Sequence, residues 1–307
     1  MCVLAGCFRD EGPQQCEGPG CTMVTSDGAS STSETSPTSP TSPTSTGTSS
    51  SETAGETTGT PVATGITMRL STMNFIDPHV FLADLTDPND PICTDITQAL
   101  NDTLADDLAS GGFNLLLHLE DPATAKEVRL VDADCEEPAM PGDLKLCTAN
   151  ESTPAVVLGL DTVDTKACSE LDPTVYAAVN VGLINTPQQP CLRTKRASFS
   201  VAISGSLGAL DLRNAQFVAS LDDAVAPTKL IDGVLYGFFT KQSAEGLTVD
   251  LPLLGMRTLW SMIDVPCAEA FPGLLPSVDT LEISGMPAPG VWLAINFTGE
   301  RVAYLSP

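Results

Sequence analysis

Residues 113–120 read Phe-Asn-Leu-Leu-Leu-His-Leu-Glu, and this stretch indicates the fold class of the chain. Its odd-numbered positions from 113 to 119 are all apolar, so their side chains project from one face of a β-strand. His118 occupies an even position, and we expect it on the opposite, exposed face. A strand with one apolar face and one wetted face is typical of an antiparallel sheet.

The same alternation recurs at Phe199 to Ile203 and again at Val291 to Phe297. From Ala209 to Leu221 the apolar residues move from even to odd positions, and a bulge at Arg213-Asn214 would absorb that shift. The run from Ile231 to Phe239 has apolar residues at both even and odd positions, so both faces of a strand formed by it would be apolar. We therefore expect it at the centre of the fold, between sheets or under a helix.

One helix is clearly signalled. Asp95, with Gln98 three residues later, forms a plausible cap, and Gly111-Gly112 ends the segment. The apolar stripe between cap and glycines consists of Ile96, Leu100, Leu104 and Leu108. A second, weaker helix is expected from Leu253 to Ile263. Short strands with so little helix favour an antiparallel β-sandwich with one or two packed helices, preceded by a disordered linker.

Composition divides the chain into three parts: a Cys-containing N-terminus at residues 1–21, a linker at 22–65 and a globular domain at 66–307. Residues 25–60 consist of Ser, Thr, Gly, Pro and a few acids, with only Ala29 and Ala54 apolar. Such a segment buries too little surface to offset the entropy of ordering. We expect a flexible stalk.

The chain is strongly acidic, with a formal net charge of −25 from 39 acids and 14 bases. Seven of the acids and one of the bases precede Ile66, which leaves 32 acids and 13 bases in the domain. A domain of this charge repels phosphate backbones, so we expect no nucleic-acid partner. The one basic cluster, at Arg193, Lys195 and Arg196, is expected to be a solvated loop next to Cys191.

Ten cysteines are present, without the paired C-x-x-C spacing of a zinc site. Cys16 and Cys21 bracket a turn, as do Cys135 and Cys147, which is the arrangement of hairpin-closing bridges. The cysteines predicted to form disulfides are Cys16, Cys21, Cys93, Cys135, Cys147, Cys168, Cys191 and Cys267. The six in the domain allow 15 pairings, among which spacing does not choose. Disulfides require an oxidising compartment, so we expect export.

Residues Leu4-Ala-Gly-Cys7 resemble the lipobox of bacterial lipoproteins, which implies that Cys7 is acylated and anchors the chain to a membrane. Only three residues precede the box, so we expect translation to start upstream of Met1. The acylation motif, the stalk and the segments 230–239 and 291–298 together resemble predicted surface lipoproteins of myxobacteria. The resemblance implies an outer-membrane-anchored, cell-surface or extracellular location, and no particular activity.

The acidic loop from Asp84 to Asp95 is the best candidate for a metal site. Asp84, Asp87 and Asp90 could supply carboxylate oxygens to calcium, which takes six to eight oxygen ligands. The spacing is not that of an EF-hand, and Asp-Pro and Asn-Asp are also ordinary turn formers. Turn formation and helix capping therefore remain the alternative, and we expect no other cofactor.

Catalytic motifs are absent from the sequence. The chain has only two histidines, His79 and His118, and neither a G-x-S-x-G elbow nor an H-E-x-x-H pair. We therefore expect a lipid-anchored surface protein with a non-catalytic binding or structural domain, and an extracellular ligand or protein as its partner. The alternative is a secreted hydrolase of polysaccharide or peptide that uses acidic residues. Glycoside hydrolysis by such an enzyme requires two carboxylates at a defined distance in space, which the sequence does not give.

Overall fold

The computed structural model describes residues 65–84, 92–121, 124–138, 140, 142–163, 166–204, 208–251, 255–267, 270–271, 273–274 and 278–306. All of them belong to one compact unit that spans Thr57–Pro307. The predicted anchor Cys7, the pair Cys16 and Cys21, and the stalk before Gly65 lie outside the described residues.

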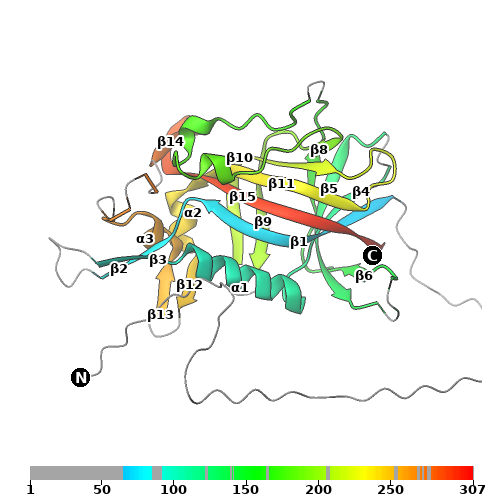
Figure 1. Cartoon of the computed structure of the whole chain (residues 1–307), viewed down its shortest axis with the longest axis horizontal. Coiled ribbons are helices and arrows are strands. Elements are labelled where there is room, and N and C mark those ends of the chain that lie inside the picture. The colour runs from blue at the N-terminus through cyan, green and yellow to red at the C-terminus, as the bar shows by residue number, and fades with distance from the viewer. Residues whose placement is uncertain are drawn as a thin grey trace, which may run out of the picture. The chain divides into compact units, whose positions relative to one another are not determined.

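The described chain is mainly β (Figure 1). Its strands are β1 (Ile66–Asp77), β2 (Phe81–Asp84), β3 (Ile92–Asp95), β4 (Leu115–Leu119), β5 (Glu127–Glu136), β6 (Leu146–Ala149), β7 (Val156–Gly159), β8 (Cys191–Arg193), β9 (Ala197–Ser204), β10 (Gly208–Leu221), β11 (Lys229–Thr240), β12 (Thr248–Leu251), β13 (Gly255–Thr258), β14 (Asp279–Ile283) and β15 (Met286–Leu305). The helices are α1 (Thr97–Ser110), α2 (Lys241–Gly246) and α3 (Leu259–Ile263), with 3₁₀ turns η1 (Pro173–Val175) and η2 (Val181–Leu183).

Five strands close into a small ring. β1 pairs with both β4 and β15, β4 pairs with β5, and β5 pairs with β6. The ring is completed by β6 and β15, which run parallel, whereas its other pairs are antiparallel. Its interior is filled by one apolar cluster, namely Leu116, Val131, Ala133, Cys147, Val302 and Tyr304. We call this unit the five-stranded ring.

A second, larger ring uses the other face of the same strands. β5 also pairs with β7, and an antiparallel bridge from Leu160 to Thr194 joins the end of β7 to the end of β8. From β8 the pairing continues through β10 and β11 to β15. The eight-stranded ring therefore shares β15, β1, β4 and β5 with the five-stranded ring, and its interior is the main hydrophobic core.

Helix α1 completes the larger core where the ring strands stop pairing. β4 pairs only with residues 66–69 of β1, and beyond them α1 packs along β1 and against β9 (Figure 1). Leu100, Leu104 and Leu108 enter the main core from this helix. As expected, Gly111 ends the helix in the left-handed conformation at φ 75°. The N-cap residue is Ile96 and not Asp95; Asp95 precedes it, and its Oδ1 accepts from Thr97 N at 2.9 Å.

A third layer covers the outer face of β10, β11 and β15. It consists of the irregular segment that contains η1 and η2, which we call the covering segment. This segment packs Tyr176 and Ile184 onto the sheet. The carboxylate of Asp77, at the end of β1, holds this segment in place. It accepts hydrogen bonds from Ala177 N at 2.9 Å and from Asn180 Nδ2 at 3.1 Å.

Several expectations about strands are confirmed. The shift within β10 is a bulge at the expected place, since Asn214 has φ 48° and the register with both β9 and β11 slips there. β11 lies between β10 and β15, with both faces covered. Val291, Leu293, Ile295 and Phe297 share the main core, as their alternation predicts.

Other expectations are wrong or unconfirmed. The two-layer sandwich is not confirmed, because the strands close into rings. The second helix begins only at Leu259, since residues 255–258 form β13. Gln98 does not complete a capping box, because its amide donates to Asp102 Oδ1 instead.

His118 is also placed wrongly by the alternation of its strand. Its side chain is only 6% exposed and lies beside Tyr304, with ring centroids 5.1 Å apart, while Nδ1 shares a hydrogen bond of 2.8 Å with the hydroxyl of Thr67. The physical reason is that β4 belongs to both rings. Its second face therefore points into the five-stranded ring and not into solvent.

The six domain cysteines form three disulfides, Cys93–Cys267, Cys135–Cys147 and Cys168–Cys191. The bridge between Cys135 and Cys147 is the hairpin closure that the spacing predicts, since the two residues face each other across β5 and β6. Of the other two bridges, Cys93–Cys267 joins residues 174 positions apart and Cys168–Cys191 joins residues 23 positions apart, and neither brackets a short turn from which spacing could predict the pair.

Candidate functional site

A pocket of about 280 Å³ opens at one end of the eight-stranded ring. Mouths of β-barrels are common ligand sites, because strand ends and turns surround a space that the core does not fill. Its walls come from β1, β4, β8, the end of β7, the β4–β5 loop and the β10–β11 turn; they are Ile66, Met68, Leu117, Leu119, Ala125, Lys126, Leu160, Asp161, Thr162, Cys191, Leu192, Arg193, Lys195, Leu221, Ala224, Pro227 and Leu230.

The floor of this mouth pocket is apolar. Met68, Leu117 and Leu230 are each no more than 1% exposed and belong to the main core. Local sequence dictates this, because each of these residues occupies the inward phase of its strand. A ligand that reached the floor would be in contact with side chains that cannot hydrogen-bond, so its buried part must be apolar.

The turn between β10 and β11 is held rigidly beside the mouth. The Asp222 carboxylate accepts backbone hydrogen bonds from Thr228 at 2.8 Å and from Lys229 at 3.0 Å. Together with the Thr228 hydroxyl, whose hydrogen bond is the largest cause, these donors lower the pKa of Asp222 to about 2. The carboxylate stays ionised and keeps Ala224 and Pro227 at the pocket wall.

Two lysines stand at the rim. The side chains of Lys126 and Lys195 are exposed, and within the described part of the chain neither has a carboxylate at ion-pair distance. The stem of Lys195 lies flat on Gly159, where an added Cβ would come within 3.2 Å of Lys195 Cδ. Glycine at this position therefore lets the lysine stem cross the end of β7.

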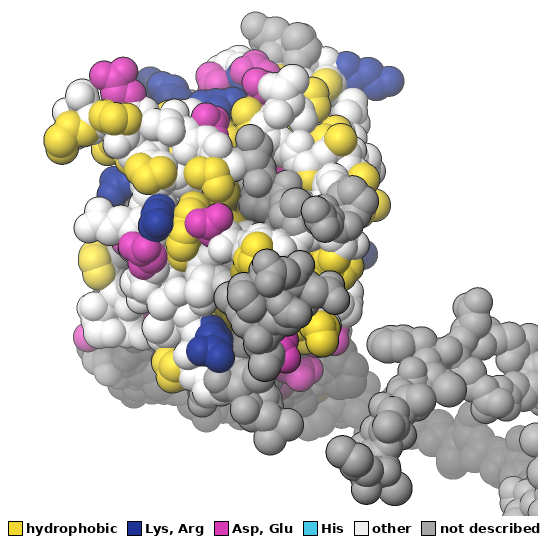
Figure 2. Space-filling model, turned by 90° about the vertical axis from the view of Figure 1, so that its left-hand side faces the viewer, with side chains coloured by type: hydrophobic (Ala, Val, Ile, Leu, Met, Phe, Trp, Pro, Cys, Tyr) yellow, Lys and Arg dark blue, Asp and Glu magenta, His cyan; other side chains and the backbone are white. Residues whose placement is uncertain are grey.

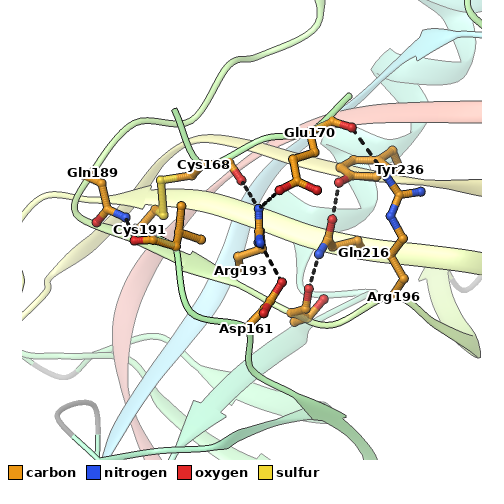
Figure 3. A network of polar contacts seen from close by, with 11 residues as sticks. Asp161, Cys168, Glu170, Gln189, Cys191, Arg193, Arg196, Gln216 and Tyr236 are labelled. Atoms are coloured by element: carbon orange, nitrogen blue, oxygen red, sulfur yellow. Dashed lines mark hydrogen bonds and ion pairs between the residues drawn. A yellow bond between two sulfur atoms is a disulfide. The ribbon is translucent and has the colours of Figure 1, made fainter. Parts of the chain in front are cut away.

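Arg193 lies behind the rim, and both of its terminal amino groups are paired, whereas its buried Nε has no hydrogen-bond partner among the described residues (Figure 3). Its Nη2 donates to Asp161 Oδ2 at 2.6 Å, and its Nη1 donates to Glu170 Oε1 at 2.9 Å. The backbone of Cys168, which is bridged to Cys191, accepts a longer bond of 3.4 Å from the same Nη1. Arg193 thus ties β8 to the covering segment and has its two terminal amino groups occupied.

A chain of polar contacts continues from Arg193 into the sheet (Figure 3). Tyr236 donates to the amide oxygen of Gln216, and the amide nitrogen of Gln216 donates to the backbone oxygen of Thr194. Arg196 lies over the ring of Tyr236 at 5.3 Å from its centroid. Burial raises the pKa of Tyr236, so this phenol remains protonated and serves as a hydrogen-bond donor.

The expectation that residues 193–196 form a solvated loop is therefore wrong for Arg193, which is 8% exposed. Lys195 and Arg196 are exposed, as expected. Sequence reasoning missed the mouth pocket, because its walls come from strands that meet only when the ring closes. One local signal of the burial of Arg193 was its position two residues after Cys191. The two residues lie in the same short strand, β8, which a disulfide holds at Cys191 and the β-bridge from Leu160 to Thr194 holds at the other end.

The other titratable candidates form no catalytic arrangement within the described residues. His79 Nδ1 and Asp95 Oδ2 are 2.6 Å apart, but no hydroxyl or thiol in the described part of the chain forms a hydrogen bond with this histidine. Burial raises the pKa of Asp77, yet donors from the covering segment occupy both of its oxygens, and it is 1% exposed. Asp77 is a structural anchor.

The calcium prediction is not tested by the structure. Asp84 is exposed at the end of β2, and Asp87 and Asp90 lie outside the described residues. Among the residues that the structure describes, no group of three or more His, Cys, Asp or Glu side chains could hold a metal ion.

Two wider hollows lie away from the mouth. One, of about 810 Å³, lies beside α2 and the β14–β15 turn, and the other, of about 710 Å³, lies beside β2, β3 and α3. Each has acidic and basic side chains in its wall, such as Asp211 and Arg213 in the first. Figure 2 shows the end of the molecule with β14 and α3, where apolar side chains and charges of both signs are interspersed.

None of the described helices is both long and apolar enough to span a bilayer. Comparison with known proteins gives no match to any protein-family model, to any curated protein or to any solved structure. The mouth pocket and its rim are thus the features from which a function can be argued.

Proposed function

We propose that this chain is an exported, lipid-anchored surface protein whose β domain is a non-catalytic binding module, with its ligand site in the mouth of the eight-stranded ring. The mouth pocket carries the proposal. It combines an apolar floor, a rigid rim and basic side chains without ion-pair partners in the described part of the chain. Binding sites of small ligands usually combine an apolar interior with a few polar groups in this way.

Export is supported by the disulfides. All six described cysteines are paired, and Cys93–Cys267 spans 174 residues of sequence. Such bridges persist in oxidising compartments. The lipid anchor at Cys7 and the stalk at residues 22–65 follow from the resemblance to surface lipoproteins, and they would hold the domain away from the membrane on a flexible tether.

The intact mass of protein extracted from membranes tests location. We expect a mass increase that corresponds to acylation at Cys7, loss of Met1 to Gly6, and a gain of two hydrogen atoms per disulfide on reduction: six for the three domain bridges and two for the predicted bridge between Cys16 and Cys21. Recovery of unacylated protein with free thiols from the cell interior would contradict the proposal. A Cys7→Ala variant should move from the membrane fraction to the soluble fraction without a change in the folded domain.

The alternative, a hydrolase that uses acidic residues, has one observation in its favour, the contact between His79 and Asp95. A general acid would need a carboxyl with raised pKa that faces a cleft. Asp77 has the raised pKa, but both of its oxygens accept hydrogen bonds inside the fold. We therefore favour the binding module.

A further inference from the structure

The chemistry of the mouth pocket points to a class of ligand. We infer that the pocket binds a single-chain amphiphile with an anionic head, such as a medium-chain fatty acid, with the chain on the apolar floor and the head at Lys126 and Lys195. This inference rests on the proposed binding function and adds the identity of the ligand class.

The size of the pocket limits the chain. An apolar cavity of about 150 Å³ holds the six carbons of benzene, so 280 Å³ corresponds to a chain of about ten carbons. The partly exposed wall residues Ala125, Leu160 and Leu221 supply apolar surface for this chain, and the buried residues Met68, Leu117 and Leu230 lie beneath them at the bottom of the pocket.

The rim selects the charge of the head. The domain carries 32 acids against 13 bases, so its net negative charge repels an anion from any part of the surface that has no basic side chains. Among the residues that line the mouth pocket, three basic side chains face a single acid, Asp161, while Asp222 in the adjoining turn is engaged by its own hydrogen bonds. Asp161 and Glu170 are both engaged by Arg193, whereas Lys126 and Lys195 have no ion-pair partner among the residues described.

The lysines can reach a bound head because both line the pocket, and hydrogen bonds fix the backbone of each beside it. Lys126 O accepts from Leu160 N at 2.7 Å, and Lys195 N donates to Gly159 O at 2.6 Å. Both residues therefore flank the end of β7, on the two sides of the bridge that closes the ring. A carboxylate between them would accept a charge-assisted hydrogen bond from each side.

Calorimetric titration of the folded domain with decanoate, decanol and decyltrimethylammonium tests the inference. We expect decanoate to bind with a stoichiometry of one, decanol to bind about tenfold more weakly, and the cation not to bind. The tenfold difference corresponds to two exposed ion pairs, each of which changes the equilibrium constant by about threefold.

Two pairs of variants locate the binding. Lys126→Gln/Lys195→Gln should make decanoate bind as weakly as decanol, whereas Lys166→Gln/Lys229→Gln, which removes the same charge from exposed positions outside the pocket, should keep the preference. Ala224→Trp should block the mouth and abolish binding of both probes. Val225→Trp, at a neighbouring residue that is 81% exposed and outside the pocket wall, should bind as the wild type does.

The outcomes separate the two proposals. If decanol and decanoate bind equally and Ala224→Trp abolishes both, the mouth is a binding site but the anionic ligand class is wrong. If neither probe binds the wild-type domain, both proposals fail. If Ala224→Trp does not fold, the ratio of the affinities for decanoate and decanol still tests the anionic ligand class. That ratio should be about ten in the wild type and about one in Lys126→Gln/Lys195→Gln.

Discussion

The two rings share four strands, yet they end differently. The five-stranded ring is filled to its centre by side chains such as Leu116 and Tyr304, whereas the eight-stranded ring is closed by α1 on one side and hollow at its mouth. Neighbouring residues on β4 separate the two, since Leu116 points into the small ring and Leu117 lines the mouth pocket. The size of each ring explains the difference. The face of the shared strands that lines the small ring is covered completely by side chains, whereas the face that lines the larger ring leaves space for a ligand.

Loss of the packing of α1 against the main core should have the largest effect on the free energy of unfolding. Leu104→Ala deletes a side chain that is 0% exposed in the main core, and we expect a loss of about 2–5 kcal/mol in the free energy of unfolding. Urea denaturation of the domain measures it. Asp106→Ala, on the exposed side of the same helix, is the control and should change the free energy by less than about 0.5 kcal/mol. Equal losses in the two variants would mean that α1 does not close the large ring.

Opening the five-stranded ring should cost stability without affecting the mouth. The bridge between Cys135 and Cys147 joins β5 to β6, and β6 belongs only to the small ring. Cys135→Ala/Cys147→Ala should lower the free energy of unfolding by about 3 kcal/mol, as expected for a short loop. The affinity for decanoate should stay within about twofold of the wild type.

The contrasting double variant is Cys168→Ala/Cys191→Ala, which frees β8 and the covering segment that fixes Arg193. It should also be destabilised by about 3 kcal/mol, but it should bind decanoate more weakly. If both double variants bind equally well, the bridge at the mouth does not position the rim, and the functional difference between the two rings is lost.

The five-stranded ring should also respond to pH through His118. Burial lowers the pKa of this imidazole, the charge of Arg129 lowers it further, and Glu120 acts in the opposite direction. The unfolded chain therefore binds the proton more readily. The stabilising contribution is complete above the unfolded pKa of about 6.5 and is lost as the pH falls below it, by up to about 1.4 kcal/mol per pH unit.

Urea denaturation at about pH 7.5 and about pH 5.5 measures this effect. The free energy of unfolding of the wild type should fall more between these values than that of His118→Gln, which cannot take up the proton. Parallel changes in the two proteins would show that His118 is not held in its neutral form inside the ring.

The rim lysines should contribute least to stability. Lys126→Gln/Lys195→Gln removes two exposed charges that have no ion-pair partner among the described residues, so we expect a change below about 0.5 kcal/mol in the free energy of unfolding. Thermal denaturation checks this. A larger loss would mean that these side chains support the fold and that their effect on ligand binding is indirect.

Local patterns predicted the strands well and their closure poorly. The inward phase of β15, the bulge at Asn214 and the helix from Thr97 follow from spacing, because each depends on neighbours in the sequence. The burial of His118 and Arg193 does not, since it depends on which strands meet across long separations. The mouth pocket shares that limit, because the bridge from Leu160 to Thr194 has no local signature.

The most direct test of the account is methyl NMR of the domain during titration with decanoate. The account predicts that the methyl signals of Leu117, Met68 and Leu230 shift, while those of Leu116 and Val302 in the five-stranded ring stay unchanged. Shifts of Leu116 equal to those of Leu117, or shifts confined to residues outside the mouth, would contradict the claim that only the larger ring holds a ligand.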